Sequence, residues 1–166
     1  IKKIMTNSII IIRGNHLYNL SEVFKCFKYN DLYQDSAFNN AEEFNKYLLE
    51  NYFVFANQEI ALRGIWLENG WTIICDPEMV DTVEDEALLR LSKKLNWEVY
   101  TFIIQTTSGS FGFAKYENIK QRHFFCSDSN VTDNFGSPLK EEQALNFNEK
   151  IFVDDILKLA DNFGVD

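Results

Sequence analysis

Six carboxylates lie close together in this chain and form the strongest chemical feature of its sequence. They are Asp76, Glu78, Asp81, Glu84, Asp85 and Glu86, and no Lys or Arg follows until Arg90. The chain has 25 acidic and 16 basic side chains and a net charge of −9, so the negative charge is concentrated here. Clustered carboxylates suit two kinds of chemistry: they attract a cationic partner surface, or two of them transfer protons in a cleft.

Part of this acidic run has a purely structural explanation. Asp81 or Thr82 is expected to cap a helix, and the three acids that follow then lie in its first turn, where the helix dipole favours negative charge. Asp76 is expected to face Arg63 across a hairpin. The candidate surface for a basic protein partner therefore comprises the acids Glu78, Glu84, Asp85 and Glu86, with Trp66 and Trp71 as candidate aromatic anchors.

Other reactive side chains predict no familiar catalytic or metal site. His123 and Cys126 have the right types for a base and a thiol nucleophile, but an offset of three in a strand puts them on opposite faces of a sheet. The histidines and cysteines lack CxxC and HExxH spacing, so we expect no metal site and no cofactor. Carboxylates in a cleft leave one alternative open, a small-ligand-binding protein or a hydrolase that contains a carboxyl group of raised pKa.

Bulk composition narrows the class of protein. A hydrophobic content of 46% and an aromatic content of 15% predict one folded domain over residues 1–166. The sequence pI of about 4.7 argues against a nucleic-acid partner. The aliphatic run Ile9 to Ile12 is far shorter than the roughly 20 residues that span a bilayer, so no membrane anchor is expected. Three cysteines without framework spacing predict free thiols and a cytoplasmic protein.

Patterns in the first half of the chain predict a strand, two helices and a hairpin. The β-branched segment Met5 to Arg13 predicts a buried strand. Capping patterns and apolar periodicity predict helices from Asn19 to Tyr29 and from Asn40 to Asn51. Asn69-Gly70 between two apolar runs predicts a hairpin of residues 60–67 and 71–76, in which paired residue numbers add to 139 and Arg63 faces Asp76.

The second half predicts further strands and helices. A helix should run from Asp81 or Thr82 to Leu95, and a strand with two apolar faces, Trp97 to Gln105, should be central in the sheet. Another hairpin should follow, in one of two registers. A two-residue loop would place Lys115 opposite Lys120, so we favour a three-residue loop, which places Phe113 opposite His123. The other expected segments are the hairpin strands Phe111 to Tyr116 and Lys120 to Cys126, a surface loop from Cys126 to Leu139, and helices over Lys140 to Leu145 and Asp154 to Phe163.

Hairpins in place of regular βαβ crossovers predict an α+β fold, with a mainly antiparallel sheet of about six strands and helices packed on it. With its small size and acidity, the chain resembles the immunity proteins that accompany bacterial polymorphic or contact-dependent toxins. The segments Gly70 to Ile74 and Gly136 to Glu142 contribute to the resemblance. It implies a non-catalytic protein that binds a cognate toxin, often a basic nuclease, and covers its active site or a neighbouring surface. A structural domain of a larger assembly is a third possibility.

Overall fold

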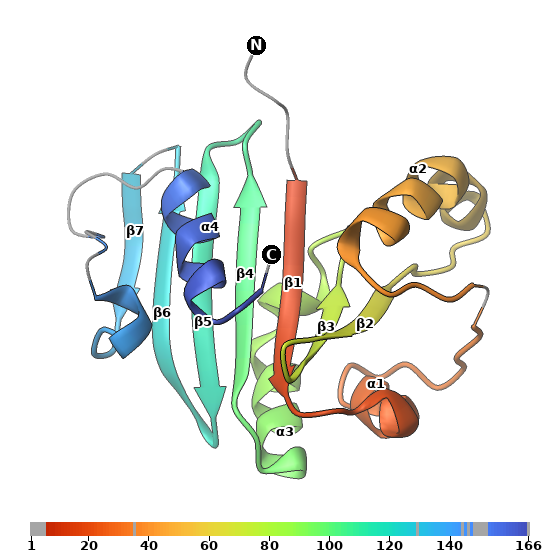
Figure 1. Cartoon of the computed structure of the whole chain (residues 1–166), viewed down its shortest axis with the longest axis horizontal. Helices are drawn as coiled ribbons and strands as arrows, with labels where there is room; N and C mark the ends of the chain where they lie inside the picture. The colour runs from red at the N-terminus through yellow and green to blue at the C-terminus, as the bar shows by residue number, and fades with distance from the viewer. Residues whose placement is uncertain are drawn as a thin grey trace.

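The computed structural model describes residues 6–34, 36–128, 130–143, 145, 147 and 153–165. In this part of the chain, one antiparallel sheet contains seven strands in the order β2-β3-β1-β4-β5-β6-β7 (Figure 1). Its strands are β1 (Thr6–Arg13), β2 (Gly64–Glu68), β3 (Trp71–Cys75), β4 (Val99–Gln105), β5 (Ser110–Glu117), β6 (Ile119–Ser127) and β7 (Asn130–Phe135). The α+β prediction is confirmed, with one strand more than expected.

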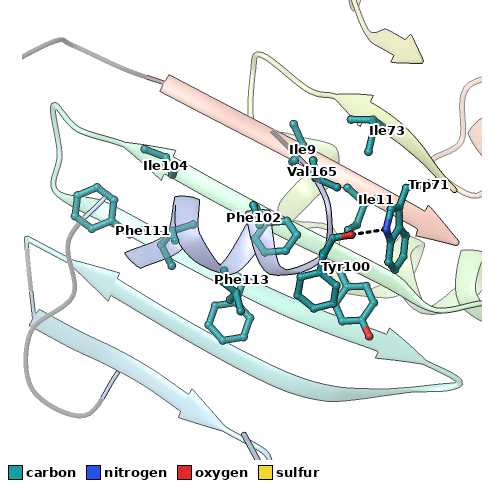
Figure 2. Close-up of a cluster of buried hydrophobic side chains, with 14 of the residues drawn as sticks. Ile9, Ile11, Trp71, Ile73, Tyr100, Phe102, Ile104, Phe111, Phe113 and Val165 are labelled. Carbon is teal, nitrogen blue, oxygen red and sulfur yellow. Dashed lines mark hydrogen bonds between the residues drawn. The ribbon is translucent and has the colours of Figure 1, made fainter. Parts of the chain in front are cut away.

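One face of the sheet packs against α4 (Val153–Asn162), which lies in front of the sheet in Figure 1. Figure 2 shows the aromatic and aliphatic side chains of this layer, including Trp71, Tyr100 and Phe102. The indole N–H of Trp71 donates a hydrogen bond of 2.9 Å to the carbonyl of Phe163, so the end of α4 is fixed to β3 by a polar contact as well as by apolar packing. Helix α2 (Ala41–Asn57) adds only one fully buried residue, Phe44, to this layer.

The opposite face packs against α3 (Asp85–Leu95) and the short helix α1 (Leu20–Lys25). In α3, Ala87, Leu88 and Leu91 recur at helical spacing and are completely buried, which is why this helix lies flat on the sheet. Basic Lys93 and Lys94 lie in its last turn, where they complement the helix dipole. Helices α2 and α4 therefore pack on one face of the sheet, and α1 and α3 pack on the other.

Two topological predictions are confirmed. Strand β4 occupies the middle of the sheet, and its residues Val99 to Ile104 are all buried. In the β2–β3 hairpin, Leu67 pairs with Thr72 and Gly64 with Cys75, the expected register. Arg63 lies just before β2 and forms an ion pair with Asp76 at 3.3 Å, as that register requires.

The prediction of one long surface loop from Cys126 to Leu139 is wrong, because residues 130–135 form the edge strand β7. Every residue of β7 is exposed, so the strand has no apolar pattern that would distinguish it from a loop. Smaller corrections concern lengths. Helix α2 continues to Asn57, β2 begins only at Gly64, and the helix expected over Lys140 to Leu145 is described as a 3-10 turn, η3 (Lys140–Glu142).

The β5–β6 register combines the predicted loop with an irregularity that was not predicted. Next to the turn, Tyr116 pairs with Lys120, as a three-residue loop requires. A register shift beside Lys115 and Tyr116 then moves the rest of the ladder by one residue, so Phe113 faces Phe124, and His123 faces Ala114. The prediction that Phe113 faces His123 is therefore wrong, and the shift decides which β6 side chains lie on each face.

Candidate functional site

The acidic run is divided by the structure into a buried part and an exposed part. Asp76 and Asp81 are buried, and both carboxylates face the guanidinium group of Arg63, at 3.3 and 2.9 Å. Burial tends to lower the pKa of Arg63, but the two carboxylates outweigh burial and raise it. This group is an internal ion cluster, and its members are not available to a partner.

The side chain of Asp76 also caps the start of the short 3-10 helix η2 (Asp81–Val83). Its Oδ2 accepts hydrogen bonds from the backbone N–H groups of Asp81 and Thr82, at 2.7 and 3.1 Å. The prediction that Asp81 or Thr82 caps α3 is therefore wrong. Helix α3 begins at Asp85, its N-cap residue is Glu84, and neither η2 nor α3 has a side-chain cap at its own N-cap position.

The exposed part of the run forms a mixed surface, which we call the acidic rim. Glu78, Glu84 and Glu86 are exposed, and Val80 and Val83 between them are 50% and 57% exposed. Glu86 lies 3.8 Å from Arg90 but remains 85% exposed, and no described residue contacts the carboxylates of Glu78 or Glu84 as a hydrogen-bond or ion-pair partner. The acidic rim therefore presents negative charge and apolar surface together.

Asp85 belongs to the predicted surface but has internal partners. Its carboxylate accepts a hydrogen bond from the Tyr116 hydroxyl and lies 3.0 Å from the ammonium group of Lys120. Burial alone would raise the pKa of Asp85, but these hydrogen bonds outweigh burial and hold the pKa below its ordinary value. A carboxyl group that acts as a general acid needs the opposite shift.

The prediction that Trp66 or Trp71 is an exposed anchor is wrong. Their side chains are buried, with Trp66 4% exposed and Trp71 1% exposed, and both belong to the core beneath α2 and α4. Both indole N–H groups are also used internally, by Glu68 and by the carbonyl of Phe163. Aromatic residues near the tip of a hairpin pack into the core here because the strands' alternation turns these two toward the helices.

A groove lies beside the acidic rim, on the α3 face of the sheet. Val83 and Asp85 border it on one side, and His123 and Phe125 border it on the other. Its volume is about 220 Å³, and its floor includes Thr101, Ile103, Gly112 and Ala114. Asp85 therefore adjoins the acidic rim in sequence and forms part of the wall of the groove.

The register of the strands explains why the sheet is hollow here. Thr101 pairs with Ala114, which pairs with His123, and the next row on this face is Ile103, Gly112 and Phe125. Three small residues therefore adjoin one another where α3 no longer covers the sheet. Gly112 is required at its position, because an added Cβ would lie 2.4 Å from the Phe125 ring and 2.6 Å from the Phe124 carbonyl.

His123 is the titratable group on the far wall. Its Nδ1 is hydrogen-bonded to the carboxylate of Asp133 in β7, and its ring stacks beside Phe125. Cys126 is fully buried with the α4-side core, which confirms that it lies on the opposite face from His123. The hydrogen bond at Nδ1 of the His123 ring is therefore to a carboxylate and not to a hydroxyl or thiol group.

Several groove residues were missed by reasoning from the sequence. Asp133 lies in the segment predicted as a loop, and His123 was assigned a different partner because of the register shift. Lys120 was considered only as a clashing neighbour in a rejected register. The signal that remained was the run of small residues at alternate positions, Gly112 and Ala114, which indicates an uncovered sheet face.

Comparisons with known proteins give no relative from which a role can be transferred. No protein-family model, curated protein or solved structure matches the chain significantly. Within the described ranges, no cluster of three or more His, Cys, Asp or Glu side chains has an arrangement that would hold a metal ion. No helix in the same ranges has the length and apolarity needed to cross a bilayer.

Proposed function

We propose that this protein is a non-catalytic inhibitor of a cognate basic protein, in the manner of a toxin immunity protein, and that it docks through the acidic rim. The observation that carries this proposal is the combination of exposed carboxylates, two of them without a described partner, with exposed apolar side chains within residues 78–86. Glu78 and Glu84 have no described partner, and Val80 and Val83 add apolar contact area. Such a surface complements a patch of lysines or arginines around small hydrophobic residues.

Electrostatics support this assignment in two ways. The net charge of −9 attracts a basic protein at long range, and the acidic rim orients it at short range. Asp85 contributes less to this field than its neighbours, because Lys120 already lies against its carboxylate. The residues on which the proposal rests are therefore Glu78, Glu84 and Glu86.

The alternative, a hydrolase or small-ligand protein, has the His123–Asp133 pair as its best argument. A histidine whose ring is oriented by a carboxylate is a common general base, although catalysis also needs a nucleophile or an acid beside it. However, the carboxyl group that borders the same groove, Asp85, has a lowered pKa and two hydrogen-bonding neighbours. A protein-binding role does not need a carboxyl group of raised pKa, so it fits these features better than a hydrolase does.

The direct test is a search for a basic partner followed by charge reversal. The full chain is immobilised, proteins bound at low salt and released at high salt are identified, and the purified partner is used in stopped-flow association. We expect the triple variant Glu78→Lys, Glu84→Lys, Glu86→Lys to slow association by about tenfold or more and to reduce its salt dependence.

A matched control separates local contact from total charge. The variant Asp31→Lys, Glu50→Lys, Asp161→Lys changes the net charge by the same amount at exposed sites in other segments of the chain. Co-expression with the partner then shows whether growth inhibition by that partner is relieved. Equal association rates for the two triple variants would show that the acidic rim is not the docking surface.

A further inference from the structure

We infer that the groove between α3 and strands β4 to β6 receives an arginine side chain of the partner, and that Lys120 occupies the head-group position until the partner displaces it. The inference rests on the proposed function, because it names the chemistry by which the same partner is recognised. It assigns a different role to Asp85 than to the acidic rim. The rim attracts the partner, and the Asp85 carboxylate pairs with one particular guanidinium group.

The shape and lining of the groove fit one long side chain. Its floor is formed by small or apolar side chains of the sheet, of which Thr101 and Ala114 are each no more than 3% exposed. A volume of about 220 Å³ accommodates one long side chain but not an aromatic cluster or a helix. An aliphatic stem in the groove would lie against Val83, which is 57% exposed, and against the half-buried ring of Phe125.

The chemistry of the two walls fits a guanidinium group. Phe125 and His123 offer neighbouring rings with an interplanar angle of 26°, and the carboxylate of Asp85 lies on the other wall. A guanidinium group is planar, stacks on aromatic rings and pairs with a carboxylate, which an ammonium group does less well. Asp133, bound to His123, adds a second negative charge on the ring side.

The protein already holds a cation at this position. The Lys120 ammonium group lies 3.0 and 3.1 Å from the two Asp85 oxygens and 5.9 Å from the centre of the Tyr116 ring. Carboxylate, aromatic ring and cation therefore form a built cation site rather than an isolated acidic residue. Lys120 lies at the start of β6 and is partly exposed, so an incoming cation is able to replace it at modest cost.

If an arginine of the partner displaces Lys120, substitutions of Lys120 and of Asp85 should have opposite effects on arginine binding. Removing Lys120 empties the position and should strengthen arginine binding. Removing the Asp85 charge should weaken it. A purely structural ion pair would give losses, or no change, for both variants, so the difference in sign identifies the role.

The experiment uses the full chain and a small probe, so it does not depend on finding the partner. Acetyl-Gly-Arg-Gly-amide is titrated into isotope-labelled protein and followed by amide NMR, with the citrulline peptide as an uncharged isostere. We expect weak binding, with a dissociation constant of about 1 to 20 mM, and shifts centred on Gly112, Ala114 and His123. The citrulline peptide should give no such shifts.

Variants complete the test. Lys120→Met should tighten binding by up to about fivefold, as expected for loss of an exposed competing ion pair. Asp85→Asn should weaken binding by about tenfold, since it removes a charge-assisted contact while keeping an oxygen for the Tyr116 hydroxyl. Lys93→Met makes the same charge change as Lys120→Met at an exposed site of α3, and Asp161→Asn matches Asp85→Asn on the opposite face.

Shifts outside the groove, equal binding of the citrulline peptide, or weaker binding by Lys120→Met would each exclude an arginine seat. If the peptide fails but a basic partner still binds through the acidic rim, the proposed function stands without the groove. If the peptide binds as expected but no basic protein is captured, the arginine seat stands and the proposed function is lost.

Discussion

The guanidinium group of Arg122 and the carboxylate of Glu142 form a two-point ion pair inside the protein, with nitrogen–oxygen distances of 3.0 and 2.8 Å. Both side chains are almost fully buried. The same guanidinium group donates to Asn134 Oδ1 and to the carbonyl of Phe135, and Glu142 also accepts a hydrogen bond from the Leu139 N–H. This pair therefore fixes the exposed edge strand β7 and the turn η3 to the body of the sheet.

Breaking this ion pair should destabilise the protein strongly. We expect Arg122→Met or Glu142→Gln to lower the free energy of unfolding by about 3 to 5 kcal/mol, because each leaves its buried partner uncompensated. The double change Arg122→Met, Glu142→Leu should cost less than the sum of the single changes. Urea unfolding measures all three. Lys140→Met is the control, because that lysine is 84% exposed and lies 3.9 Å from Glu141, and its loss should cost less than about 1 kcal/mol.

Arg63 should be equally sensitive to substitution, for a different geometric reason. Arg63→Met leaves the buried carboxylates of Asp76 and Asp81 without their cation and should cost about 3 to 5 kcal/mol. Arg63→Lys should recover only part of this, since one ammonium group does not reproduce the guanidinium fork. Hydrogen exchange at the amides of Asp81 and Thr82 should become faster, because Asp76 holds both. If exchange at these amides is unchanged in a destabilised Arg63→Met variant, Arg63 does not support the hydrogen bonds that hold η2.

Gly136→Ala should be much more harmful than Gly70→Ala, although both glycines have φ of +82°. A Cβ at Gly136 would lie 2.0 Å from the carbonyl oxygen of Gln121, whereas a Cβ at Gly70 meets nothing within 4 Å. Gly70→Ala should cost about 1 to 2 kcal/mol, the ordinary penalty for a left-handed alanine. Gly136→Ala should cost clearly more and loosen β7 from β6. Similar melting temperatures for the two variants would contradict this difference.

Stability should fall in alkaline solution, partly through Cys75. Burial raises the pKa of the Cys75 thiol to about 12, with the nearby Asp76 charge adding to the effect. The unfolded chain loses this proton near pH 8.5, so the thiol's contribution is complete below that pH and is lost as the pH rises toward 12. The expected slope is about 1.4 kcal/mol per pH unit over this window.

The measurement for Cys75 is a series of urea unfolding curves under reducing conditions at increasing pH. Cys75→Ala removes the thiol and should show a shallower decline than the unmodified chain. Cys26, Tyr100 and Tyr116 also have raised pKa values because they are buried, so both proteins will lose some stability. The informative quantity is therefore the difference between the two slopes, and equal slopes would exclude the Cys75 contribution.

Local patterns predicted the elements whose geometry depends on neighbours in the chain. The Asn69-Gly70 turn sets the β2–β3 register because a two-residue loop leaves no freedom in pairing, and this placed Arg63 beside Asp76. The two apolar faces of residues 99–104 likewise required a central strand, since both faces had to be covered. The α3 helix was predicted from the helical spacing of its apolar residues, although its start was placed too early.

Predictions failed where non-local pairing overrides local pattern. Strand β7 has no buried residue, so only its hydrogen bonds with β6 make it a strand. Trp66 and Trp71 were considered as surface anchors, but the direction of each side chain depends on which sheet face the helices cover. The capping role of Asp76 was missed because its partners, Asp81 and Thr82, are brought to it by the turn after β3.

The sequence by itself determined the α+β class, the first hairpin and the concentration of carboxylates, because turn chemistry, apolar alternation and charge are written in adjacent residues. The tertiary structure decided which carboxylates are free to act. Asp76 and Asp81 are enclosed around Arg63, Asp85 is paired with Lys120, and Glu78, Glu84 and Glu86 remain exposed. That division depends on contacts between residues far apart in the chain, and the free energy of burying a charge is set by those contacts rather than by the charge's sequence neighbours.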